Sequence, residues 1–146
     1  MQQLDIFADS RDCALANTLA EALAGADIAA SLAAAAALRD EFPGDRHLAP
    51  AAHLIQALQA DQQAGDTPFA DASSAAAARQ HLQHTLQPAA LDMLGTEGAK
   101  RWLATRWQAL ARRARTLPFD GASSEIHAAA LFLQGHDWAA AAAAVQ

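Results

Sequence analysis

The chain has 146 residues, of which 53% are apolar and 18% charged, and its formal net charge at pH 7 is −6. The length suits a single domain with its own core, and the apolar content excludes a disordered chain. No apolar run approaches the roughly 18 residues of a membrane span, and the first residues lack a secretory signal pattern. Because Cys13 is the only cysteine, an internal disulfide is excluded, and we expect a cytoplasmic protein.

The composition is strongly biased toward helix. Alanine fills 43 of the 146 positions and tyrosine is absent. Alanine has the highest helix propensity, whereas β-branched and aromatic residues favour strands. The chain is therefore predicted to be one all-α domain over residues 1–146, built from seven to eight helices stacked as antiparallel hairpins.

Capping and breaking residues give the expected helix boundaries. Asp9 or Ser10 is expected to cap the first helix, Gly25 to end it and Asp27 to cap the second. Gly95 is expected to separate two later helices. In chain order, the expected helices run over residues 10–24, 27–42, 50–65, 75–86, 88–94, 97–116, 124–134 and 137–146.

Two stretches of the chain repeat one pattern. "GADIAASLAAAA" begins at Gly25 and "GHDWAAAAAAVQ" at Gly135, and both place Asp and then a large apolar residue before an Ala-rich helix. The pattern resembles the tetratricopeptide repeat family, whose helical hairpins imply a concave surface that binds a peptide or helix of another protein. The matching positions are Asp27, Ile28, Ser31, Ala35, Leu38 and Pro43, and then Asp137, Trp138 and Ala141.

The last expected helix stops at Gln146 without a C-terminal glycine or basic residue. Two explanations stay open, a natural end or the N-terminal part of a longer protein. In a helical stack a cut helix leaves an apolar face to be covered, and a homodimer through the terminal hairpin is a further alternative.

Charge is distributed unevenly along the chain. Residues 1–71 carry three arginines against eleven acidic residues, a net of −8, and residues 72–146 carry seven basic against five acidic residues, a net of +2. The 97–116 helix holds most of the basic residues, on the side opposite its apolar stripe. The predicted basic surface comprises Lys100, Arg101, Trp102, Arg106, Arg112 and Arg113.

This basic surface has three interpretations. It could bind an acidic protein, a phosphate backbone or an acidic membrane face. It could be a solvated face with Trp102 stacked on Arg106. It could also face the acidic half of its own chain or of a second copy. The acidity of the whole chain argues against general nucleic-acid binding.

Residues that carry catalysis are sparse. His81 and His84 lie one helical turn apart and could reach one metal ion, but no HExxH motif, cysteine pair or nearby acidic cluster accompanies them. No phosphate-binding glycine loop and no GxSxG motif is present. We therefore expect no catalytic residue, no metal site and no cofactor, and a metal-dependent enzyme is the third-ranked function.

The first residues form a separate motif. Residues 3–7, Gln-Leu-Asp-Ile-Phe, resemble the short peptide by which bacterial replication and repair proteins bind the sliding clamp. The resemblance implies that Gln3 bonds at the edge of a groove while Leu4, Ile6 and Phe7 fill its pockets, with residues 1–8 extended. The alternative is that these apolar residues pack on the first helix.

Together these patterns predict a non-catalytic bacterial protein that binds another protein or peptide through tetratricopeptide-like hairpins. The alternative is a replication or repair accessory protein that binds the sliding clamp through residues 3–7.

Overall fold

The computed structural model describes residues 2–117, with side chains from Arg11 onward. Every regular element in this range is helical, which confirms the all-α fold. The expected helices 124–134 and 137–146, and the second copy of the repeat at Asp137 to Ala141, lie outside the described residues.

The described elements are α1 (Gln2–Ala24), α2 (Ile28–Glu41), α3 (Leu48–Ala64), α4 (Ala72–His81), the π-helical turn η1 (Leu82–Leu86) and α5 (Gln87–Ala114). Because α4, η1 and α5 follow one another without a gap, they form one helical stretch with a kink at Gly95, and residues 2–117 contain four such stretches. Six of the seven to eight expected helices fall within residues 2–117, so the expected number is too high for the part of the chain that the structure describes. The physical reason is that helical hydrogen bonding continues through Leu86 and Gln87, where a break was expected.

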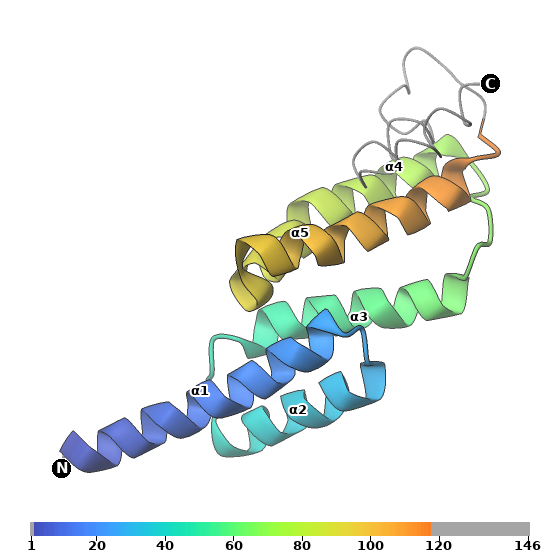
Figure 1. Ribbon diagram of the computed structural model, residues 1–146. Helices are drawn as coiled ribbons and strands as arrows, with labels where there is room; N and C mark the ends of the chain where they lie inside the picture. Colours follow the sequence, from blue (N-terminus) through green and yellow to red (C-terminus); the bar gives the residue numbers. More distant parts are fainter. Residues whose placement is uncertain (1, 118–146) are drawn as a thin grey trace.

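The helices form two layers on either side of α3. Figure 1 shows α1 and α2 side by side as a hairpin on one side of α3, and α4 and α5 paired on the other. The first turns of α1 extend beyond the end of α2 (Figure 1). None of the helices within residues 2–117 is long and apolar enough to cross a membrane.

α1 begins eight residues earlier than expected. Neither Asp9 nor Ser10 caps it, because the helix runs without a break from Gln2 to Ala24. No glycine or proline interrupts this stretch. Residues 2–8 are thus helical here and not extended.

The turn between α1 and α2 is built differently from the sequence expectation. The amide of Asp27 donates to the carbonyl of Ala22 at 3.1 Å, and the amide of Ala26 donates to that of Leu23 at 3.0 Å. These are the two bonds of a Schellman motif, in which the left-handed residue is usually glycine. Here Ala26 takes that conformation, with φ 54°, while Gly25 precedes it.

Asp27 then caps α2 as expected. Its carboxylate accepts a hydrogen bond from the backbone amide of Ala30 at 3.0 Å. Asp71 does the same for α4 by accepting from the amide of Ser74 at 2.8 Å. This bond holds the pKa of the Asp71 carboxyl below its ordinary value.

Two residues shape the last helical stretch. Pro88 lacks an amide hydrogen and its ring conflicts with the carbonyl four residues earlier. The preceding π turn widens the helix there, and the amide of Gln87 donates to the carbonyl of Leu82. Gly95, with φ 71° and ψ 179°, then leaves helical geometry, so that the rest of α5 returns beside α4 (Figure 1).

The core follows the predicted apolar stripes closely. Leu19, Leu23, Leu38 and Leu54 are fully buried. Leu32 differs, because it is 46% exposed although its helical spacing from Ile28 predicts a buried position. The buried residues of α2 are instead Ser31, Ala34 and Leu38.

Candidate functional site: a pocket between α3, α4 and α5

The basic residues of α5 meet the acidic end of α3. The Nε atom of Arg106 lies 2.8 Å from Oδ2 of Asp61, and Nε of Arg112 lies 3.3 Å from Oδ1 of Asp66. The two oppositely charged parts of the chain therefore pair with each other in one molecule. These two ion pairs place Arg106 and Arg112 against the acidic half of the same chain.

Arg113 fastens the α3–α4 loop to α5. Its Nε donates to the carbonyl of Thr67 at 2.8 Å, and its guanidinium carbon lies 4.0 Å from the centre of the Phe69 ring. The amide of Phe69 donates in turn to the carbonyl of Arg113 at 2.9 Å. Phe69 is itself buried, so these contacts join the α3–α4 loop to the end of α5 and to the core.

Trp102 does not lie on the basic surface, which corrects the sequence prediction. It is 5% exposed, and the guanidinium of Arg106 lies 5.0 Å from the centre of its ring. The indole is inside because α5 packs against both α3 and the end of α1. The stacking of Trp102 on Arg106 is confirmed, and the side chain of Arg106 is itself only 12% exposed.

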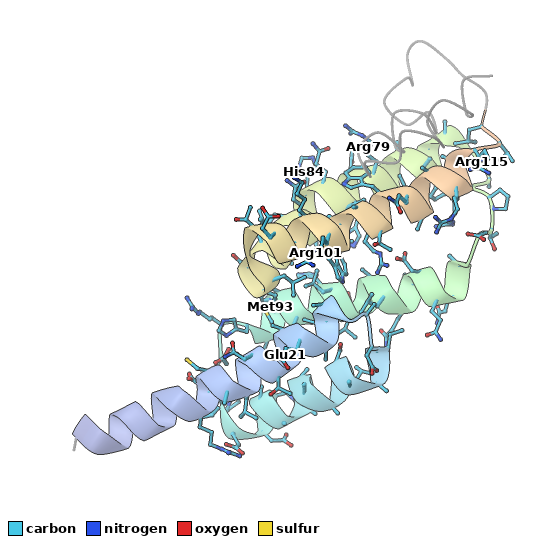
Figure 2. The ribbon with its side chains drawn as sticks, viewed as in Figure 1. Glu21, Arg79, His84, Met93, Arg101 and Arg115 are labelled. Atoms are coloured by element: carbon cyan, nitrogen blue, oxygen red, sulfur yellow. The ribbon has the colours of Figure 1, made fainter. Side chains whose placement is uncertain are left out.

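Lys100, Arg101 and Arg112 are the exposed members of the predicted basic surface. Figure 2 shows Arg101 on the side of α5 that faces α1 and α3. It lines a shallow hollow of about 300 Å³ together with Ala24 and Ala26 at the end of α1.

A pocket of about 280 Å³ opens beside the arginine–aspartate contacts. Its walls come from the second half of α3, from α4 with η1, and from the second half of α5. Most of the lining side chains are apolar or small. The lining residues are Gln56, Ala57, Ala60, Asp61, Gly65, Ala78, His81, Leu82, Leu86, Arg106, Ala109, Leu110 and Arg113.

The charged pair at this pocket is partly buried. Oδ2 of Asp61 and the Nε and Nη1 atoms of Arg106 are shielded from solvent, yet none of them makes a hydrogen bond of acceptable geometry within the described residues. Desolvation raises the pKa of Asp61, although Arg106, Arg113 and Arg112 oppose the shift. Desolvation also lowers the pKa of Arg106 against the attraction of Asp61. For both groups, desolvation therefore outweighs the attraction of the partner in setting the direction of the pKa shift.

His81 and His84 do not act together. His81 lines the pocket, whereas His84 lies on the outer side of η1 with Arg79 on α4 (Figure 2). The π turn that begins at Leu82 changes the helical register between the two histidines. Within residues 2–117 no group of three or more His, Cys, Asp or Glu side chains is placed to hold a metal ion.

The predicted clamp-binding residues lie apart from this pocket. Gln3, Leu4, Ile6 and Phe7 belong to the first two turns of α1, whose backbone is helical. A groove-bound extended peptide would require these turns to unwind first.

Comparison of the chain with protein-family models finds no match, and neither the curated proteins nor the solved structures provide one. The site must therefore be interpreted from its own geometry.

Sequence reasoning identified Arg106 and Arg113 but missed the pocket that they border. Asp61 and Ala78 carry no motif, and the pocket forms only because three helices converge. The charge asymmetry between the two halves of the chain was the signal that could have paired Asp61 with the basic helix.

Proposed function

We propose that this protein is a non-catalytic interaction module, in which helical hairpins stacked in a tetratricopeptide-like way present the α3–α4–α5 pocket to a partner protein. The observation that carries the proposal is the pocket itself. It is an apolar-walled opening at the meeting of three helices, with charged groups at one side. Ligand sites in proteins combine these same features, mostly apolar walls and a few placed polar groups.

A contact between two of the elements that form the walls supports this function. The contacts between Arg113 and Phe69 join the end of α5 to the α3–α4 loop. A preformed pocket binds at a lower entropic cost than one that must be ordered first. The size of about 280 Å³ is at the low end for ligand pockets, which suits an anchor side chain of a partner.

The hairpin of α1 and α2 gives the tetratricopeptide resemblance its structural support. Asp27 caps α2 and the small residue Ser31 is fully buried, which are two of the positions that carry the resemblance. A repeated array also needs the second copy of the pattern, at Asp137 to Ala141.

Site-specific photo-crosslinking in cells tests this function. A benzophenone amino acid replaces His81 or Gln56, which line the pocket, and Gln80 serves as the matched control because it is exposed on α4 outside the pocket. We expect the same crosslinked protein from the two pocket positions and none from Gln80. Equal crosslinking from Gln80, or no defined product from the pocket positions, would contradict the proposal.

A further inference from the structure

The pocket carries an excess of positive charge although the whole chain is acidic. Its lining contains one acidic residue, Asp61, and two arginines, Arg106 and Arg113. With His81 neutral, the lining therefore has a formal charge of +1, against −6 for the whole chain. An occupant with one negative charge would complement it.

Arg106 also has hydrogen-bonding capacity that the described residues do not satisfy. Nε and Nη1 of Arg106 are buried without a well-formed hydrogen bond within the described part of the chain, although Nε lies 2.8 Å from Oδ2 of Asp61. Nε of Arg113 is engaged by the carbonyl of Thr67, while its guanidinium covers the Phe69 ring. A guanidinium in apolar surroundings favours a carboxylate, because charge-assisted bonds to it are about twice as strong as neutral ones.

The remaining walls are apolar. Leu82, Leu86 and Leu110 come from η1 and α5, and alanines from all three helices leave the space between them. An occupant must therefore place a large apolar group and a carboxylate close together. A single C-terminal residue with a large apolar side chain does both.

We propose that the pocket recognises the C-terminal residue of a partner protein, with its apolar side chain against Leu82, Leu86 and Leu110 and its carboxylate near Arg106 and Arg113. This inference rests on the proposed function and names the chemistry of the partner. Capture of terminal carboxylates is a known mode of peptide recognition.

The test is an NMR titration of the full chain with methyl-labelled leucine and alanine. The probes are N-acetyl-phenylalanine, which has a free carboxylate, its uncharged amide, and acetate, which has the charge alone. We expect the acid to shift the signals of Leu82, Leu86 and Leu110 and to bind about fivefold more tightly than the amide. Acetate at the same concentrations leaves these signals unchanged.

Substitutions of lining residues test the contributions of arginine charge and of pocket shape to binding separately. Arg113→Gln removes the preference for the acid, and Arg113→Lys restores part of it. Arg112→Gln is the matched control, because it removes the same charge from a residue that does not line the pocket. Ala78→Leu fills the pocket and weakens both probes, whereas Ala77→Leu on the exposed side of α4 does not.

Three results would overturn this inference: equal affinity for acid and amide, an acid preference that survives Arg113→Gln, or signal changes confined to residues outside the pocket. The crosslinking experiment distinguishes this failure from failure of the proposed function. If a partner is crosslinked at position 81 while the acid and the amide bind equally, the proposed interaction module is supported and recognition of a carboxylate is ruled out.

Discussion

Arg113 and Phe69 contact each other through both their backbones and their side chains. The amide of Phe69 donates to the carbonyl of Arg113 at 2.9 Å, and the guanidinium of Arg113 lies over the Phe69 ring at 4.0 Å. The two residues are far apart in the sequence, and their contact joins the α3–α4 loop to the end of α5. One wall of the pocket depends on this contact.

Phe69→Ala should destabilise the protein by about 3 kcal/mol, because it removes a buried aromatic side chain and the surface under Arg113. Arg113→Ala should cost less, and the double variant should cost less than the sum, since each change removes the same cation–π contact. Urea denaturation of the wild type, the two single variants and the double variant measures the coupling energy between the two changes. Strict additivity would show that the stacking contributes no stability.

Asp61→Asn should increase stability at pH 7 by a fraction of a kcal/mol, since the side chain is 40% exposed and solvent screens its charge. Burial raises the pKa of Asp61 above its ordinary value of 3.8, so the folded state holds the proton more tightly than the unfolded state. The contribution of Asp61 to stability is therefore fully present below about pH 3.8 and is lost as the pH rises through the folded pKa.

The stability difference between Asp61→Asn and the wild type should accordingly disappear as the pH falls toward 3.8. Denaturation midpoints measured from pH 3.5 to 7, at roughly half-unit steps, follow this dependence. A variant that is less stable than the wild type at pH 7 would show that attraction to Arg106 outweighs desolvation.

Exchanging the order of Gly25 and Ala26 should stabilise the α1–α2 turn. Ala26 has a left-handed backbone conformation, which costs a residue other than glycine about 1 kcal/mol. Gly25 has no positive φ, so its backbone conformation does not require glycine. A Cβ atom at Gly25 would meet its nearest neighbour, the carbonyl oxygen of Glu21, at 3.5 Å, an ordinary contact. Thermal unfolding of the double variant Gly25→Ala with Ala26→Gly should show the gain. A loss on Ala26→Gly alone would contradict the structure of this turn.

Gly95→Ala should destabilise the protein by roughly 1–3 kcal/mol, because φ 71° with ψ 179° is a region that residues with a Cβ atom rarely adopt. Gly44→Ala is the matched control. A Cβ atom there meets nothing within 4 Å, and the residue has no left-handed backbone. Equal stability of the two variants would indicate that α5 does not reverse at Gly95.

Clamp binding through residues 3–7 stays a prediction with its own test. If purified sliding clamp binds this protein, Leu4→Ala combined with Phe7→Ala should abolish binding, while Arg112→Glu with Arg113→Glu should leave it unchanged. Protection of the amides of residues 2–9 against hydrogen exchange would argue against this use of the terminus, since a helix must unwind before it can bind as an extended peptide.

Much of the fold could be predicted because helix formation is a local property. The stripe Ala51, Leu54, Ile55 and Leu58 is buried as its spacing predicts. Errors arose where tertiary contacts or backbone geometry decide. Leu32 is exposed because α2 packs through Ser31 instead, and Ala26 adopts the conformation expected of a glycine.

The site was harder to predict than the fold. The basic residues of α5 were visible in the sequence, but their partners Asp61 and Asp66 lie more than 40 positions earlier. Only the convergence of three helices shows that Trp102 is buried and that Arg106 borders a pocket. Such long-range pairing leaves no periodic pattern in one sequence.

The most direct test of the interaction module repeats the crosslinking from position 81 in a variant whose pocket is filled by a larger side chain. The benzophenone amino acid at His81 is introduced into Ala78→Leu and, as control, into Ala77→Leu, with the stability of both proteins measured first. We expect the crosslinked partner to be lost in Ala78→Leu and retained in Ala77→Leu. Retention of the same crosslinked protein in a stable Ala78→Leu variant would show that partners do not bind in this pocket.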